Sequence, residues 1–228
     1  GWSDQVATTV DRTAPSVTIT SPASPTDDAR PTWSWVGTDV LSGVDYYLVA
    51  LDSEPSFETE DVVYQPASDL GDGSHILRVK AVDVAGNASE WFYSDAVVVD
   101  TTPPAVPGIP RPEETPTKIV TPAWSWAASP DAASYNVYLD DDFIANVAAT
   151  EFARADYALF GVAPLTEGIH HLQVTAIDGV GNESDMSGTG HVVIDLTPPT
   201  VPVLDVLPPF TKAASVTLAW TAVDGAVS

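Results

Sequence analysis

Residues 73–87 read GSHILRVKAVDVAGN, and residues 168–182, which lie 95 positions later, read GIHHLQVTAIDGVGN. In both copies hydrophobic and polar residues alternate through the middle of the stretch, which is the pattern of a half-buried β-strand. Each copy closes on Asp-x-x-Gly-Asn. That sequence favours a hairpin turn, because Gly accepts a positive φ and Asp and Asn bond their own backbone. The stretch therefore predicts a long strand that ends in a hairpin, twice in one chain.

Two further landmarks recur in the same order around this stretch. An Asp-x-Thr-x-Pro motif begins at Asp11, Asp100 and Asp195, and an aromatic strand carries Trp33 and Trp35, then Trp124 and Trp126, then Trp220. The spacing is close to the roughly 100 residues of an immunoglobulin-type sandwich. We expect the last strand of a preceding repeat at 1–13, complete repeats at 14–101 and 102–196, and the first strands of a third repeat at 197–228, so that both ends cut a repeat.

The alternation predicts strands throughout both repeats. In the first repeat they are Ser16–Thr20, Thr32–Val36, Asp45–Asp52, Val62–Gln65, His75–Asp83 and Asp95–Asp100. In the second they are Val120–Ala127, Ser134–Asp140, Phe143–Ala148, His170–Asp178 and His191–Asp195. The best helical candidate is Glu151–Phe160, which we interpret as a turn or an insertion between strands.

The paired tryptophans lie two positions apart, so each pair shares one face of its strand. Their recurrence favours a place in the core between two sheets, while a sugar-stacking platform remains an alternative. Trp91 follows the Asn87 turn and is the better candidate for an exposed tryptophan.

Composition excludes several classes of function. Asp and Glu number 32 against 8 for Lys and Arg, a net charge of −24, which excludes nucleic acid and disfavours anionic membranes. There is no cysteine, and no apolar run is long enough to insert into a membrane. We find no catalytic motif and expect the chain not to be an enzyme.

The stretches Gly73–Asn87 and Gly168–Asn182, together with the Val-Asp-Thr-Thr-Pro-Pro linker at 99–104, resemble Ig-like and fibronectin III-like repeats of large bacterial surface proteins. The resemblance implies an all-β chain of tandem Ig-like or fibronectin III-like β-sandwiches joined by Pro-rich linkers. It implies an extracellular or cell-surface location and a role as a spacer or adhesive arm. An accessory carbohydrate-binding or spacer module of a secreted hydrolase is the alternative, and some similar arrays bind calcium at their junctions.

The direction of the strands brings acidic loops together where each linker arrives. The incoming linker, the turn after the second strand and the Asp-x-x-Gly-Asn turn all lie at this end of a sandwich, as does Asp45. Calcium prefers six to eight oxygens from such loops. The candidate ligands are Asp11, Asp39, Asp83 and Asn87 in the first repeat and Asp100, Asp131, Asp178 and Asn182 in the second. Ordinary hairpin turns and stiff proline linkers explain the same residues without an ion.

The remaining candidates are interpreted as structural or as partner contacts. His75 and His170 occupy equivalent positions and are expected to bond a neighbouring loop. Asn87 and Asn182 begin glycosylation sequons that follow from the repeated turn. The expected partners are neighbouring repeats and a protein or glycan ligand. The segments Trp2–Asp11 and Ser215–Thr221 are expected either to pair between molecules or to be loosely held, because unpaired strands invite pairing.

Overall fold

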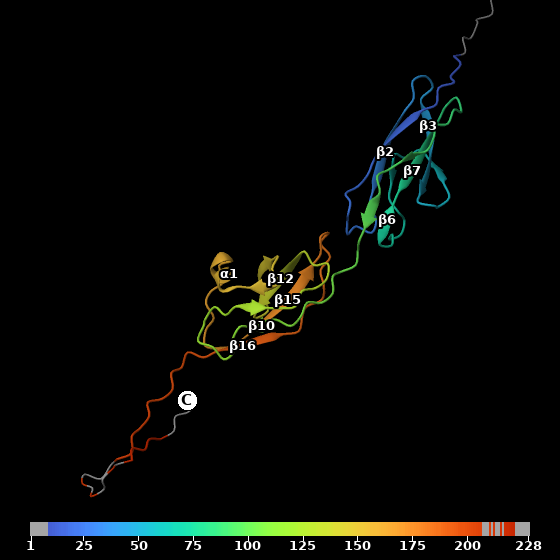
Figure 1. Ribbon diagram of the computed structural model, residues 1–228. Coiled ribbons are helices and arrows are strands. Elements are labelled where there is room, and N and C mark those ends of the chain that lie inside the picture. Colours follow the sequence, from blue (N-terminus) through green and yellow to red (C-terminus); the bar gives the residue numbers. More distant parts are fainter. Residues whose placement is uncertain (1–8, 207–209, 211, 213–214, 216, 222–228) are drawn as a thin grey trace, which may run out of the picture. The chain divides into compact units, whose positions relative to one another are not determined.

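The computed structural model describes residues 9–206, 210, 212, 215 and 217–221, and these are built mainly of β-strands and loops (Figure 1). By proximity the chain forms two compact units. The first takes in the residues up to Val106, with Ala128–Tyr135 and Thr175–Met186; the second takes in Pro107–Ala127, Asn136–Val174 and the residues from Ser187 on. The repeat boundaries after residues 13, 101 and 196 stay predictions.

In residues 9–99, nine strands form three sheets. They are β1 (Ser16–Thr20), β2 (Trp33–Thr38), β3 (Val44–Leu51), β4 (Phe57–Thr59), β5 (Val63–Tyr64), β6 (Gly73–His75), β7 (Leu77–Asp83), β8 (Phe92–Tyr93) and β9 (Val97–Val99). The sheet orders are β1-β2-β5, β4-β3-β7-β8 and β6-β9. All the pairings between these strands are antiparallel.

The following strands form two more sheets, of order β10-β11-β14 and β13-β12-β15-β16. They are β10 (Arg111–Pro112), β11 (Trp124–Ser125), β12 (Ser134–Leu139), β13 (Asp142–Val147), β14 (Glu151–Phe152), β15 (Gly168–Ile177) and β16 (Gly190–Ile194), with the helix α1 (Arg154–Leu159) between β14 and β15. In both sets the early strands and a later strand make one sheet and the central strands make a second, while in the first set β6 and β9 pair separately. This is the arrangement of Ig-like and fibronectin III-like sandwiches, and it confirms the predicted all-β fold class.

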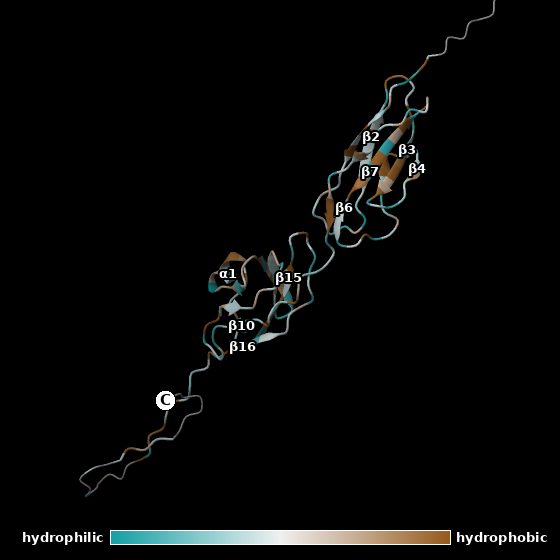
Figure 2. Cartoon of the chain, turned by 45° about the vertical axis from the view of Figure 1, so that its right-hand side comes forward, coloured by the Kyte–Doolittle hydropathy of each residue, from teal (hydrophilic) through white to brown (hydrophobic). Residues whose placement is uncertain are grey.

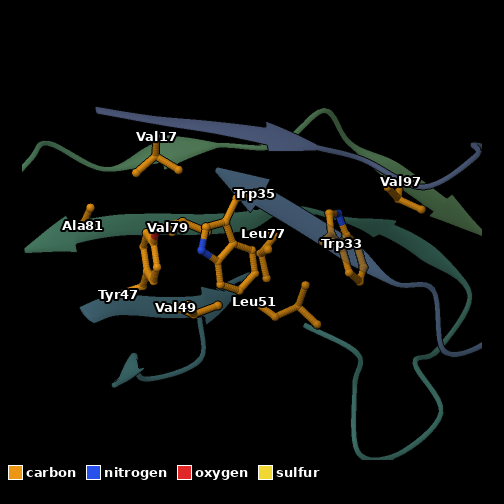
Figure 3. Packing of buried hydrophobic residues seen from close by; sticks show 10 residues of the cluster. All are labelled: Val17, Trp33, Trp35, Tyr47, Val49, Leu51, Leu77, Val79, Ala81 and Val97. Carbon is orange, nitrogen blue, oxygen red and sulfur yellow. The ribbon is translucent and has the colours of Figure 1, made fainter. Parts of the chain in front are cut away.

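The first core lies between the two facing sheets (Figure 3). Trp33 and Trp35 on β2 are 0% and 2% exposed, and they pack with side chains from β3 and β7. Hydrophobic residues colour much of β3 and β7 in Figure 2. The ring of Tyr47 meets Trp35 edge-on, with ring centroids 5.7 Å apart. The tryptophan pair is therefore core, as predicted.

The second core uses its tryptophans in the same way. Trp124 and Trp126 are 1% and 6% exposed. The indole nitrogen of Trp124 donates to the hydroxyl of Tyr157, 3.3 Å away, whereas the indole nitrogen of Trp33 is buried without a hydrogen-bond partner. The two cores thus share their hydrophobic pattern and differ in one polar contact.

Several predicted elements change in length or kind. The strand predicted at Val120–Ala127 shortens to β11, in keeping with Pro122, which has no N–H for a ladder bond. The segment Glu151–Phe160 contains the two-residue strand β14 followed by α1. A short helix therefore stands where a turn or an insertion was predicted. The carboxylate of Asp156 accepts the N–H of Ala153 at the start of α1. The short strands β4, β8 and β10 were not predicted.

The described residues near the C-terminal end include a small hairpin. Leu204 and Trp220 form an antiparallel bridge, and the N–H of Asp205 donates to the carbonyl of Ala219 at 2.9 Å. Trp220 is 63% exposed, while its equivalents Trp35 and Trp126 are buried. Part of the predicted exchange segment Ser215–Thr221 therefore pairs within its own chain, and most of Trp2–Asp11 lies outside the described residues.

Candidate functional site

The Asp-x-x-Gly-Asn turn has the same geometry in both copies. Asp83 Oδ1 accepts the N–H of Asn87 at 2.7 Å, and Asp178 Oδ1 accepts the N–H of Asn182 at 2.9 Å. In each copy the second carboxylate oxygen accepts the Asn side-chain amide at 2.8 Å. The Gly before the Asn has a φ of 88° in one copy and 111° in the other, which is the left-handed region that favours glycine. The turn prediction is confirmed in both places.

Each of these turns holds the linker that reaches it. The side-chain amide of Asn87 donates to the carbonyl of Asp11, 3.4 Å away, and that of Asn182 donates to the carbonyl of Asp100, 2.8 Å away. We call this pair of contacts the linker clamp. It gives the Asn of the repeated motif a role beyond its own turn: the Asp fixes the amide, and the amide fixes the incoming chain.

In the first repeat three carboxylates meet beside the clamp. Oxygens of Asp11, Asp39 and Asp83 all lie within 4.8 Å of one another, and the three residues come from the linker, the β2–β3 loop and the end of β7. We call them the carboxylate cluster. In the described part of the chain it is the one group of three or more acidic, His or Cys side chains this close together.

Asp39 is held at the cluster by its own loop. Its Oδ2 accepts the N–H groups of Leu41, Ser42 and Gly43 at 2.8–3.0 Å. Its Oδ1 is buried and has no hydrogen-bond partner. A buried carboxylate oxygen without a donor costs free energy, so this oxygen is suited to a cation.

Hydrogen-bond donors lower the pKa of two carboxylates of the cluster, those of Asp39 and Asp83. The bond from Gly43 is the largest influence on Asp39 and, together with those from Leu41 and Ser42, it lowers the pKa below the ordinary value despite burial. Burial and the charge of Asp39 both raise the pKa of Asp83, but the bonds from Asn87 outweigh them and the pKa is lowered. Asp39 and Asp83 are therefore anionic at neutral pH, and their like charges face one another.

The second repeat reproduces the clamp without the cluster. Asp178, Asn182 and the backbone of Asp100 come together, but Asp131 is exposed with a φ of 64° and joins no such group. In the equivalent loop the N–H of Ser129 donates to the Tyr135 hydroxyl at 3.1 Å, and the Ser129 hydroxyl donates to the carbonyl of Ala105. Asp45, also expected at this end of the first repeat, is exposed and outside the cluster.

The two equivalent histidines do bond neighbouring loops, as predicted. Nδ1 of His75 lies 2.8 Å from Asp52 Oδ2, and Nδ1 of His170 lies 2.6 Å from Asp140 Oδ2. The aspartates were missed as functional residues. One signal was available, because in each copy an Asp is the last residue of the predicted strand before the next turn.

A second missed group holds the outgoing chain. Asp72 accepts the N–H and the hydroxyl of Thr101, both at 2.8 Å, and also the hydroxyl of Thr102. The hydroxyl of Thr102 is the largest of the bonds that lower the pKa of Asp72. In the second repeat Glu167 Oε1 accepts the hydroxyl of Thr197 at 2.6 Å. An acidic residue directly before the repeated Gly at 73 and 168 was the signal in the sequence.

The aromatic residues at 91–93 do not form an exposed row, which is the feature that would favour a carbohydrate-binding module. Trp91 is half-buried, with the guanidinium of Arg78 5.0 Å and the ammonium of Lys80 5.6 Å from its ring centroid. Phe92 is half-buried against the core, and Tyr93 alone of the three is exposed. Trp91, the better candidate for an exposed tryptophan, is therefore only partly exposed, because two long cationic side chains of β7 cover its ring.

The glycosylation sequons lie in the clamp turns. Both Asn side chains are engaged, and Ser89 and Ser184 are buried, where their hydroxyls accept N–H groups of the preceding strand.

In the part of the chain that the structure describes, no helix has the length and apolar character needed to cross a membrane.

Comparison with known proteins gives structural neighbours only. No family model matches the sequence, and no curated protein matches it. Among solved structures, fibronectin(III)-like modules of CbhA from Clostridium thermocellum match with a TM-score of 0.44 and 15% identity over 78% of this chain and 94% of that chain. A run of titin domains matches at 0.45 and 10% over 78% and 66%, and the FN1–FN3 domains of chicken CNTN1 match at 0.39 and 14% over 76% and 66%.

Proposed function

We propose that this chain is a set of non-catalytic spacer modules of a bacterial extracellular or cell-surface protein, and that calcium stiffens the linker at the carboxylate cluster. The observation that carries the proposal is the convergence of linker, loop and turn at one end of the sandwich. The clamp holds the arriving backbone, and the cluster places three carboxylates from three segments around one point.

The donor set of the cluster fits calcium. Ligand oxygens on opposite sides of a calcium ion are about 4.8 Å apart, since each lies about 2.4 Å from the ion, and the three carboxylate oxygens fall within this separation. The ion would neutralise the facing charges and supply a partner for Asp39 Oδ1. Because Asp11 belongs to the linker and the other two belong to the sandwich, binding would fix the linker to the sandwich.

Adhesive and carbohydrate-binding functions have less support. A carbohydrate-binding module of a secreted hydrolase was expected to show an exposed aromatic row, and Tyr93 is the one exposed member. A spacer attached to a secreted hydrolase uses the same linker contacts and differs in its neighbours in the parent protein. Binding to a glycan array would favour the carbohydrate-binding alternative.

Calcium titration followed by thermal melting tests the proposal. A ligand that binds only the folded state stabilises it by RT ln(1 + c/Kd), where c is its free concentration, which is about 1.4 kcal/mol when c is ten times Kd. We expect the melting temperature to rise in millimolar calcium, since extracellular calcium modules bind with Kd of about 0.1–1 mM.

Two substitutions localise the effect. Asp39→Asn keeps an acceptor for the loop N–H groups but removes one charge, and we expect it to abolish most of the calcium response. Asp131→Asn, in the equivalent loop of the second repeat, is the matched control and should leave the response unchanged. The proposal fails if calcium does not stabilise the unmodified chain, or if both substitutions reduce the response equally.

A further inference from the structure

The end of each sandwich where the chain leaves carries the same arrangement of His, Asp and a carbonyl group. Nε2 of His75 lies 2.9 Å from the carbonyl of Gly71, and Nε2 of His170 lies 3.0 Å from the carbonyl of Thr166. With Nδ1 facing Asp52 or Asp140, both ring nitrogens of each histidine face an acceptor. A neutral imidazole has one N–H, so it makes one of the two bonds, whereas an imidazolium makes both.

The aspartate of each pair is fixed by the backbone around it. Asp52 and Asp140 have φ values of 49° and 51°. Their N–H groups donate to the carbonyls of Ile76 and His171 at 2.9 Å, and their Oδ1 atoms accept the N–H groups of those same residues at 2.8 and 2.9 Å. The carboxylate therefore sits in one orientation, with Oδ2 left for the imidazole.

The carbonyl of each pair belongs to the turn that holds the outgoing chain. Gly71 is followed by Asp72, which binds Thr101 and Thr102. Thr166 is followed by Glu167, which binds Thr197. The imidazole thus ties the turn that carries the linker-binding carboxylate to the end of the neighbouring strand.

We propose that His75 and His170 act as charged latches, which hold the outgoing linker while they are protonated and loosen it when they lose the proton. The device occurs twice with the same atoms, and the side chains of His75 and His170 are only 15% and 14% exposed. Loss of the proton leaves a partly buried nitrogen and oxygen facing each other without a hydrogen between them, which removes the tie between the turn and the strand.

Other titratable groups lie near the two latches. Tyr64 is within electrostatic range of Asp52 and Glu54, Arg78 lines the same surface hollow as Asp52, and Asp72 follows Gly71. Tyr157 is within electrostatic range of Asp140, His171 bonds Asp141, and Glu167 follows Thr166. His171 also approaches Asp140, with Nδ1 3.4 Å from Oδ1. The acidic groups favour the imidazolium, while Arg78 and His171 oppose it.

The direction of the pKa shift agrees with the geometry. Burial lowers the pKa of both histidines, but the bonds to the aspartate and to the carbonyl outweigh burial, and the net pKa is raised above the ordinary value. A raised folded-state pKa means that the latch contributes fully below the ordinary histidine pKa of about 6.5 and that its contribution is lost as pH rises through the folded value.

The test begins with NMR titration of the full chain. We expect His75 and His170 to titrate above about 6.5, the value of histidine in an unstructured peptide, which serves as the reference. Asp52→Asn should lower the pKa of His75 and leave that of His170 unchanged, and Asp140→Asn should do the reverse. Asn tolerates the left-handed backbone, so each variant removes charge without forcing a new turn.

Hydrogen exchange tests whether the protonation state of His75 affects the outgoing linker. The amide of Thr101 donates to Asp72, and its protection factor, corrected for intrinsic exchange at each pH, should fall by several-fold as pH passes through the pKa of His75. In His75→Gln this fall should disappear. The proposal is overturned if His75 and His170 titrate at or below the unstructured-peptide value, or if the protection of Thr101 is independent of the state of His75.

Discussion

The upstream ends of the two repeats share one contact and differ in another. Both use an Asp to fix an Asn, and both use that Asn to hold the carbonyl of an incoming linker. The first adds Asp39 to form the carboxylate cluster, while the second fills the equivalent loop with the hydroxyls of Ser129 and Tyr135. A hydroxyl both donates and accepts, so it satisfies its neighbours without an ion.

This difference separates two roles that the repeated motif combines. The clamp is built into the turn and needs no ligand. The cluster has facing charges and a buried oxygen without a donor, which is an arrangement that a cation would stabilise. One repeat is therefore expected to respond to calcium and the other to hold its linker without it.

The largest loss of stability is expected from tryptophan substitutions in the two cores, which differ in whether the buried indole nitrogen has a hydrogen-bond partner. Trp33→Ala and Trp124→Ala should each cost about 3–5 kcal/mol, as truncation of a buried Trp does. Trp→Phe should cost a different amount of stability at the two positions. At Trp124 it leaves the buried Tyr157 hydroxyl without its donor and should cost about 1 kcal/mol more than at Trp33, whose indole nitrogen has no partner. Chemical denaturation measures both, and equal losses would show that the Tyr157 contact contributes nothing.

A smaller effect is expected where the turns are anchored. Asp178→Asn should lower the melting temperature by several degrees, because three turn N–H groups and the Asn182 amide bond the ionised carboxylate. Asp83→Asn should cost less without calcium, since it also relieves repulsion from Asp39, and more with calcium. Melting each variant with calcium and with a chelator checks the order.

The pH dependence of the same carboxylates follows from their pKa values. Burial raises the pKa of Asp178, but the bonds from Asn182, Val180 and Gly181 outweigh it, so the folded pKa is lowered. Its contribution is present above the ordinary Asp value of about 3.9 and is lost as pH falls through the folded value. Asp178→Asn should therefore reduce the acid sensitivity of unfolding, and an unchanged acid profile would contradict this account.

The sequence was sufficient for the meeting of the first cluster's three aspartates, because this depends on chain direction and on a repeated turn, whereas the Asn bond that forms the clamp was not predicted. Antiparallel strands of a sandwich place linker, loop and turn at one end, and this brought Asp11, Asp39 and Asp83 together in advance of coordinates. The buried tryptophans followed from the two-residue spacing on one strand.

The sequence was insufficient in two situations. In one, the second repeat uses side chains of different chemistry from those in the first. In the other, the contact depends on backbone angles. Asp131 was placed in the second cluster by analogy with Asp39, but the Ser129 and Tyr135 hydroxyls take that loop instead. Asp52 and His75 are 23 positions apart, and a left-handed φ at Asp52 sets their meeting, so periodicity carries no sign of it.

The smallest effect is expected from the clamp itself, and it compares the two linkers directly. Asn87→Ala and Asn182→Ala each remove the bond to the turn carboxylate, so this loss cancels between them. What remains is the bond to the linker, 3.4 Å in the first repeat and 2.8 Å in the second. A hydrogen bond contributes about 0.5–1.5 kcal/mol, and the shorter contact should contribute more, so Asn182→Ala should destabilise by the larger amount when calcium is removed. Adding calcium should widen the gap, because the cluster then secures the first linker without its Asn. A larger loss from Asn87→Ala under both conditions would show that the first linker depends on its amide, and the division of roles between clamp and cluster would be wrong.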